Sequence, residues 1–406
     1  MVTKFMSFLS YKNLIITNII IVILKIMYVT MIQKEFSTLE DYTIAYNLVN
    51  YHQYSEYIQQ GGTAFKLPVY PFFIGFFLYF LGDKALIGVA VFQAILSFFS
   101  PVFIYRILKL FGYEKIGVLS GILFIVSPAY FLYPEIIEAS NVFIPILLLW
   151  FYLYFRIWFL IDVKKSNFVI LGVVTALLFL TQVVIVPLSC LMILGLLLFK
   201  KSSFKNVFYL VFTVIVLYSP WIVRNYFVFD KIILSKSPVW QNIYYGFTPN
   251  GQLLDDLKLI TNERDDYLYH LRNDVNELKM EEIYKKEVEK MTHWESSYFI
   301  KKAASNLLCL WYVPPKYFYD NSLSILFGRK IYVILLDFFT IMSLILLYRK
   351  SKALFYFSIL FFVSFSFPYV IGHAANTRFK LDFEWYQLIL VSFVVIELIN
   401  KNKKAL

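Results

Sequence analysis

Long apolar stretches separated by short polar segments fill most of the chain. A helix needs about 20 residues to cross about 30 Å of hydrocarbon, and ten stretches reach or approach that length. The predicted spans are 13–33, 85–110, 115–133, 138–160, 166–182, 183–200, 205–222, 331–348, 353–371 and 383–399. The fifth and sixth share one apolar run, with a boundary near Gln182. The pattern predicts an all-α, polytopic membrane helical bundle of about ten spans.

One further apolar run, at 68–82, has only 15 residues and contains two prolines and two glycines. As a helix it would be about 22 Å long, which is too short to cross the hydrocarbon. We therefore expect an interfacial or re-entrant segment on the outer side of the membrane.

This arrangement divides the chain into three regions. Residues 1–223 form a seven-span module with a first outer loop at 34–84, residues 224–330 form a mainly helical extracytoplasmic loop domain, and residues 331–406 form a three-span region. Basic residues gather at the span ends assigned to the cytoplasm, among them Arg106, Lys109, Arg156, Lys200 and Arg349. Because such residues mark the cytoplasmic side, we expect a plasma (inner) membrane protein with both termini in the cytoplasm.

Composition agrees with this class of protein. Hydrophobic residues make up 60% of the chain and charged residues 16%, whereas a soluble domain has about 25% charged residues. A disordered chain, a coiled coil and an ordinary soluble enzyme are therefore excluded. The net charge of +11 lies mostly at the ends of spans, so it indicates topology, and no basic–aromatic motif points to nucleic acid. Cys190 and Cys309 form no CxxC pair and give no metal or redox motif.

The second outer loop contains a run of charges. Residues 255–302 hold 12 of the 27 acidic residues. The part from Asp265 to Lys302 predicts one or two surface helices whose charges are simply solvated. His270 and His293 lie in this run without the spacing of a zinc site, so we predict no metal there.

The first outer loop opens with two adjacent acids, Glu40 and Asp41. A carboxylate near the lipid surface could have a raised pKa and act as a general base. The alternative is a helix cap, because an amphipathic helix with Ile44, Ala45 and Leu48 on one side follows directly. The local sequence alone favours the cap.

Cations stand at three outer positions where the topology disfavours them. Lys66 precedes the 68–82 run, and either an anionic head group or an interfacial anchor would explain it. Arg224 and Asn225 end the seventh span, and a guanidinium there suits bidentate phosphate contact. The last outer turn adds His373, Arg378 and Lys380. Two cationic clusters opposite a carboxylate pair predict extracytoplasmic chemistry on a lipid phosphate.

Four motifs carry a resemblance to a known family. They are the acidic pair, the KLPVYP run that contains Lys66 and Tyr70, the PWIVRNYFVFDK segment, and the RFKLDFE run that enters the last span. In order and spacing they resemble the GT-C glycosyltransferases, above all the bacterial membrane enzymes grouped with protein O-mannosyltransferases and the lipid A aminoarabinose transferase. The resemblance implies that Asp41 is the catalytic carboxylate and Glu40 its neighbouring acid. It also implies that Lys66, Arg224 and Arg378 contact phosphate.

Two departures from the family pattern stand out. The family often has an acid at the opening of the fourth span, where this chain has Asn141, with Glu138 one turn earlier. At the end of the fifth span the family often has T-R-P, where this chain has Thr181, Gln182 and Val183. We therefore include Glu138 and Asn141 among the candidate substrate-binding residues.

The resemblance implies an inverting glycosyltransferase that moves a sugar from a polyprenyl-phosphate donor to an acceptor hydroxyl on the extracytoplasmic face. The acceptor would be a lipid, a glycan or a protein, and membrane lipids surround the enzyme. We expect no cofactor, and a divalent metal ion is not indicated because no second set of ligands is evident. An O-antigen-type polymerase or ligase and a lipid or sugar flippase are the alternatives; a flippase should show two related halves, and we find no internal repeat.

Overall fold

The computed structural model describes residues 6–33, 35–131, 133–159, 163–312, 323–374 and 377–405. These residues form helices and no strand, so the predicted all-α class is confirmed. Six helices in the described part are long and apolar enough to cross a membrane, and two apolar helices, Lys165–Phe179 and Val183–Leu198, are shorter.

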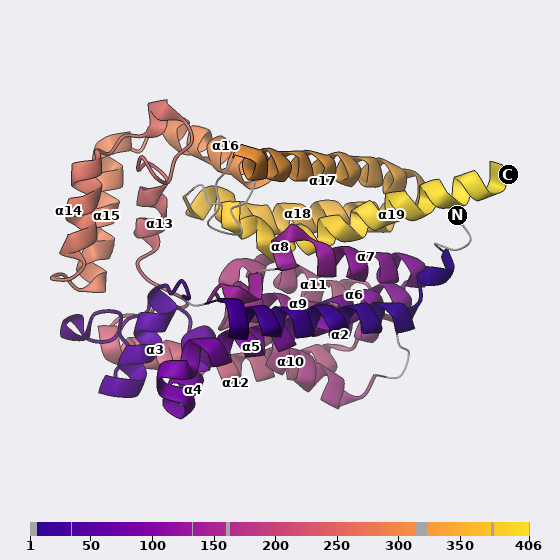
Figure 1. Cartoon of the computed structure of the whole chain (residues 1–406). Coiled ribbons are helices and arrows are strands. Elements are labelled where there is room, and N and C mark those ends of the chain that lie inside the picture. Colours follow the sequence, from indigo (N-terminus) through magenta and orange to yellow (C-terminus); the bar gives the residue numbers. More distant parts are fainter. Residues whose placement is uncertain are drawn as a thin grey trace.

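The helices form two layers (Figure 1). The first layer holds α2 (Tyr11–Met27), α5 (Ala85–Ser97), α6 (Phe99–Leu110), α7 (Glu114–Val126), α8 (Pro128–Phe131), α9 (Ser140–Phe159), α10 (Lys165–Phe179), α11 (Val186–Leu198) and α12 (Phe204–Phe229). The second layer holds α16 (Ser296–Tyr312), α17 (Leu323–Lys350), α18 (Lys352–Gly372) and α19 (Leu381–Ala405).

Shorter helices cluster at one end of these layers (Figure 1). They are α3 (Glu40–Tyr51), α4 (Val69–Leu81), α13 (Val239–Tyr245), α14 (Asn262–Leu271) and α15 (Glu277–Thr292). Both described ends of the chain lie at the opposite end. The predicted even number of spans places both termini on one side of the membrane and both predicted outer loops on the other. The structure groups these segments in the same way. Which end faces the cytoplasm remains a prediction from the basic residues.

Each predicted span coincides with helix, and two of them are interrupted. The span at 85–110 consists of α5 and α6, which join at Phe98 with helical backbone angles. The span at 115–133 is divided at Ser127, whose ψ is 133°. Proline disfavours the helical conformation in the residue before it, and Pro128 follows Ser127. The chain therefore turns here and starts α8.

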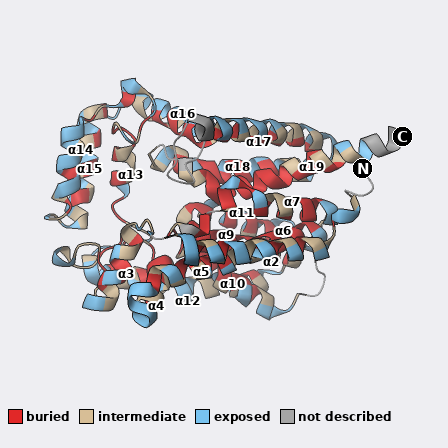
Figure 2. Cartoon of the chain, in the orientation of Figure 1, coloured by how far each residue is buried: buried red, intermediate tan, exposed pale blue. Residues whose placement is uncertain are grey.

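Large apolar side chains cover the outside of the bundle, as expected for lipid contact. On α12, Phe208, Phe212 and Ile215 are each more than half exposed, and Figure 2 shows exposed residues along the outer helices. The two layers are joined by an aromatic core in which the ring centroids of Phe151 and Trp385 lie 5.7 Å apart. This interface positions the C-terminal helices against the N-terminal module.

The 68–82 run forms a single short helix, α4, which has 13 residues. Such a helix is about 20 Å long, so its length agrees with the predicted interfacial segment. Tyr70 and Ile74 are buried, whereas Phe72, Phe76 and Phe80 are more than half exposed. The exposed phenylalanines give α4 an apolar face.

The charged run folds into more helices than the sequence predicted. Residues 265–302 contribute to α14, α15 and the beginning of α16 instead of one or two helices. Asn276 caps α15 through its side chain, and His293 ends it in the left-handed conformation with a φ of 46°. Polar residues that compete for backbone hydrogen bonds favour such boundaries.

Candidate active site

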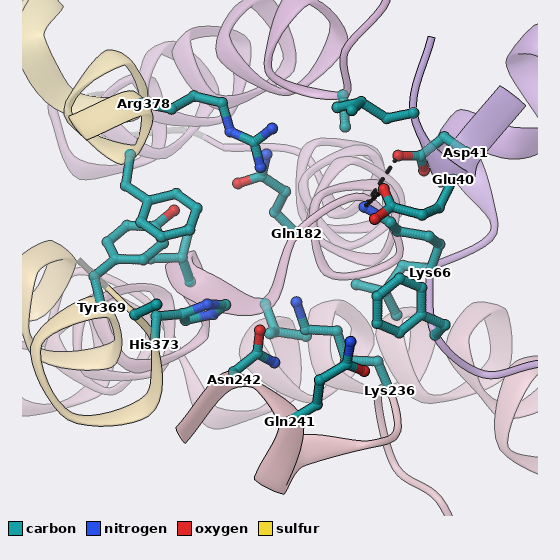
Figure 3. A pocket seen from close by; sticks show the side chains of 18 of the residues that line it. Glu40, Asp41, Lys66, Gln182, Lys236, Gln241, Asn242, Tyr369, His373 and Arg378 are labelled. Carbon is teal, nitrogen blue, oxygen red and sulfur yellow. Dashed lines mark ion pairs between the residues drawn. The ribbon is translucent and has the colours of Figure 1, made fainter. Parts of the chain in front are cut away.

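A cavity of about 400 Å³ opens at the end of the bundle that carries the short helices. The N-terminal module, the segment around α13 and the C-terminal helices all contribute to its wall (Figure 3). Six of the predicted site residues line it, namely Glu40, Asp41, Lys66, Glu138, His373 and Arg378. The fold therefore brings together side chains that lie more than 300 positions apart in the sequence.

One wall carries the acidic pair. The Lys66 ammonium nitrogen lies 3.3 Å from a carboxylate oxygen of Glu40 and 3.3 Å from one of Asp41. The Asp41 side chain is 9% exposed and that of Glu40 is 36% exposed. One cation thus faces two acids, and the cluster keeps a net negative charge.

The electrostatics of this wall follow from its packing. Burial acts to raise the pKa of Glu40, but Lys66 and a backbone hydrogen bond together bring it below its usual value. Burial acts to lower the pKa of Lys66, yet Asp41 and Glu40 raise it above its usual value. Glu40 and Lys66 therefore stay charged together at neutral pH.

The helix-cap interpretation of this acidic pair is wrong. The N-cap of α3 is Leu39, and no side chain caps the helix. Glu40 and Asp41 lie in the first turn, where the helix dipole favours negative charge. Ile44 and Ala45 are fully buried, so the predicted amphipathic face anchors α3 and leaves the acids directed at Lys66.

A second ion pair joins the two layers across the cavity. Arg378 binds the Glu138 carboxylate, and the Tyr133 hydroxyl donates to the same carboxylate. Beside it, Asp382 accepts hydrogen bonds from the hydroxyls of Ser140 (2.8 Å) and Tyr369 (2.7 Å). The acids on this wall therefore have protein partners already.

His373 follows α18 directly and lies opposite the acidic pair (Figure 3). Its ring packs beside the stacked rings of Tyr369 and Phe379, with centroid distances of 5.6 and 5.0 Å. Burial and the surrounding cations lower the pKa of His373 well below its usual value. The imidazole is therefore neutral at physiological pH and presents one donor and one acceptor nitrogen.

Lys236 is a cavity residue that the sequence analysis missed. It lies in the segment between α12 and α13 and lines the cavity beside His373 and Gln241 (Figure 3). Burial and the charges of Lys66 and Arg378 lower the pKa of Lys236 to about 8. Within the described residues its ammonium group has no hydrogen-bond or ion-pair partner. Its position just after the quoted PWIVRNYFVFDK segment was the available signal.

Amide side chains line the rest of the cavity. Gln182, Gln241 and Asn242 all face it. Gln241 is 2% exposed, and its carbonyl oxygen is buried without a partner among the residues described. A buried acceptor of this kind is costly unless a donor reaches it. Gln182 occupies the place of the family's arginine and donates to Ser140 at 3.3 Å.

The structure does not bring Arg224 or Asn225 to the cavity. The Arg224 guanidinium donates to the backbone carbonyls of Thr63 (2.7 Å) and Tyr54 (3.1 Å). Asn225 is fully buried; it accepts from Arg224 and donates to the carbonyl of Ile233. Arg224 therefore holds the first outer loop in place, and Asn225 holds Arg224 and the segment after α12.

Tyr70, Asn141 and Lys380 are also directed away from the cavity. Tyr70 donates to Gln93, and Asn141 donates to the carbonyls of Tyr133 and Ile136. Lys380 is fully buried, with its ammonium nitrogen 3.4 Å from Asp337. Each satisfies a polar group inside the fold, where an unpaired group would be costly.

Two cations of the charged run, Arg272 and Lys302, are buried and so are exceptions to the predicted solvated face. Arg272 is 8% exposed, lines the cavity, and lies 2.7 Å from the Glu56 carboxylate. Nearby, Glu277 accepts hydrogen bonds from the Thr63 hydroxyl (2.6 Å) and the Ala64 N–H (3.1 Å). We call Arg224, Arg272 and Glu277 the loop clamp, because all three bind residues 54–64.

Metal ligands do not gather in the described part of the chain: it contains no group of three or more His, Cys, Asp or Glu side chains that could hold an ion. The cysteines are unpaired, with Cys190 exposed and Cys309 buried.

Comparison with known proteins gives one match. Residues 66–223 match the family model described as dolichyl-phosphate-mannose-protein mannosyltransferase. No curated protein sequence matches the chain. The matched stretch begins at Lys66 of the cavity and ends inside α12, one residue before Arg224. The match covers less than half of the chain and confirms the predicted resemblance to GT-C membrane glycosyltransferases.

Proposed function

We propose that this protein is an inverting glycosyltransferase that moves a sugar from a polyprenyl-phosphate carrier to an acceptor hydroxyl at the extracytoplasmic end of the bundle. The observation that carries the proposal is the cavity in which a carboxylate pair faces the Lys236 ammonium group, which has no partner among the described residues. The reaction needs a base for the acceptor and a cation for the departing phosphate. The cavity offers one of each on different walls.

Asp41 is the proposed general base. Two carboxylates share the single cation Lys66, so one negative charge is left to take up a proton. In the reaction Asp41 accepts the proton of the acceptor hydroxyl, and the acceptor oxygen forms a bond to the anomeric carbon. The bond between that carbon and the phosphate oxygen breaks, and its electron pair leaves with the polyprenyl phosphate. Attack from the face opposite the leaving group inverts the anomeric configuration.

Lys236 is the proposed partner of the leaving phosphate. Departure adds negative charge to the phosphate, and a preplaced cation stabilises that charge without reorganising at the moment of reaction. Arg378 and Arg272 also line the cavity, but they already bind Glu138 and Glu56. Lys236, with its lowered pKa still near 8, remains mostly protonated at neutral pH.

The amide groups are the proposed contacts for the sugar. Gln182, Gln241 and Asn242 can donate to or accept from hydroxyl groups, and the unpartnered carbonyl oxygen of Gln241 would gain a donor when a sugar binds.

The test is a transfer assay with the full chain in vesicles. The donor is a polyprenyl-phosphate sugar labelled in the sugar, supplied with a membrane fraction as the source of acceptor. We expect label to leave the lipid and appear in a product whose anomeric linkage is inverted, with no solute movement across the vesicle. Solute movement without transfer, or a product with retained configuration, would refute the proposed function.

A further inference from the structure

Helix α16 has its polar side inward, unlike a helix on the surface of a soluble protein. Its residues Lys302, Ser305 and Asn306 are buried, whereas Ile300 and Leu308 are more than half exposed. Buried polar groups need partners within the protein. The polar face of α16 must therefore bind something inside the fold.

Ser305 donates to Gln252, whereas the partner of Lys302 and Asn306 is the C-terminal end of α18. The Lys302 ammonium donates to the carbonyls of Ile371 (3.0 Å) and His373 (2.8 Å). The Asn306 amide donates to the carbonyls of Val370 (3.0 Å) and His373 (2.7 Å). The last carbonyls of a helix have no partner inside it, and a cation there also suits the helix dipole. Together these two side chains cap α18.

The approach of Lys302 to this site depends on a glycine. A Cβ atom on Gly246, which follows α13, would lie 2.1 Å from Cε of Lys302. The side chain of Lys302 is 1% exposed and has no carboxylate partner among the described residues. Burial lowers the pKa of Lys302 to about 8. A buried lysine that contacts only carbonyl groups is costly to keep, and packing alone does not require it.

What the cap holds is the stretch of chain that carries His373. The His373 carbonyl accepts from both Lys302 and Asn306, while its ring lines the cavity. Its ring nitrogens have no protein partner in the described part of the chain. The charged and titratable groups around the ring come from every neighbouring element, namely Lys66, Lys236, Lys302, Tyr369, Arg378 and Asp382.

We propose that Lys302 is a positioning residue: by capping α18 it sets the place of the His373 imidazole at the cavity wall, where that ring accepts a hydrogen bond from a substrate hydroxyl. The identity of the ligand rests on the proposed function. The position and titration of His373 do not, so they are measured without any transfer reaction.

The experiment is a pH titration of the histidine side chains by NMR, on the full chain labelled at histidine. The chain has four histidines, and His373→Asn assigns the signal. In the wild type His373 stays neutral until the pH is well below 6.5, whereas in Lys302→Met the midpoint moves up by about one pH unit because a nearby positive charge is lost. Lys302→Arg keeps the charge and stays near the wild type.

Two further variants keep the test decisive. Gly246→Ala displaces Lys302 while keeping it charged, and Gly246 has ordinary backbone angles (φ −68°, ψ −2°) that alanine adopts. This variant should change the chemical shift of the His373 signal. Lys301→Met removes an exposed neighbour that pairs with Asp256 at 3.2 Å, and it should change neither property. If Lys302→Met and Gly246→Ala leave the shift and titration of His373 as in the wild type, the positioning role is refuted, whatever happens to the melting temperature.

The consequence for catalysis is read from the pH profile. In Lys302→Met the acidic limb of the pH–rate profile should shift to higher pH together with the titration midpoint of His373. A merely structural role of Lys302 would instead lower the transfer rate equally at all pH values. An altered titration with no transfer by the wild type would refute the proposed function and leave the positioning intact.

Discussion

The cavity and the loop clamp lie at the same end of the molecule, and both are rich in charged groups, yet they differ in how those groups are satisfied. In the clamp, Arg224 and Glu277 bind backbone and hydroxyl groups of the first outer loop. In the cavity, Lys236 has no partner among the described residues, and one acid of the Glu40–Asp41 pair is left uncompensated. Polar groups that have partners in the protein stabilise the fold, whereas polar groups without partners are available to bind a ligand. Substitutions in the two regions should therefore have separable effects.

The largest effect is expected from Asp41→Asn. Loss of a positioned base typically lowers a rate by a factor of about 10²–10⁴, and the variant should melt close to the wild type because asparagine keeps the shape of the side chain. Transfer of labelled sugar and thermal unfolding in detergent measure the two properties. Asp83→Asn, an exposed aspartate outside the cavity, is the matched control and should transfer normally.

The next largest effect is a loss of stability when the loop clamp is broken. Glu56→Gln leaves Arg272 charged and buried, and breaking a buried ion pair costs about 3–5 kcal/mol. The melting temperature should fall markedly, while the folded fraction keeps most of its transfer rate. Asp256→Asn removes an exposed pair that contributes about 0–1 kcal/mol, so it should melt like the wild type. A Glu56→Gln protein with unchanged melting would contradict the clamp.

Lys236→Met tests the opposite wall of the cavity. A hydrogen bond to a charged group contributes about 1.5–3 kcal/mol, so transfer should fall about 10- to 100-fold without loss of stability. Lys84→Met, an exposed lysine on the same side of the bundle, is the control. Equal transfer rates for these two variants would rule out Lys236 as the phosphate partner.

The smallest effect is a pH dependence of stability at Glu277. Burial raises the pKa of Glu277 from 4.5 to about 7. Because the folded state then binds a proton more tightly than the unfolded state, this contribution is greatest at low pH and is lost as the pH rises through about 7. Between pH 6 and 8 the loss amounts to about 1 kcal/mol.

Melting curves at several pH values check this dependence. Glu277→Gln mimics the protonated carboxyl group and should flatten the curve between pH 6 and 8, whereas the exposed Glu282→Gln should keep the wild-type slope. A wild-type protein that becomes more stable from pH 6 to pH 8 would contradict the predicted direction of this pH dependence.

The hydrophobic pattern predicted the helices well because span length is a local property. It failed at Ser127, where Pro128 divides a span, and in the charged run, where side-chain caps set the boundaries. Both are local signals that a hydropathy window averages out.

The site was only partly predictable. Asp41, Lys66, His373 and Arg378 were identified because they are charged or polar residues at the edge of apolar spans. The same reasoning selected Arg224 and missed Lys236, although both follow the seventh span. The difference between them is the presence of partners: carbonyl groups of the first outer loop bind Arg224, and such long-range contacts are set by the tertiary fold.

Binding of the reaction product tests the central claim most directly, since it separates chemistry from recognition. Labelled polyprenyl phosphate is bound to the wild type, Asp41→Asn and Lys236→Met in vesicles at equal protein concentration. We predict that Asp41→Asn binds it like the wild type while transferring no sugar, and that Lys236→Met binds it more weakly by about 10-fold or more. Wild-type binding by Lys236→Met, together with normal transfer by Asp41→Asn, would contradict the account.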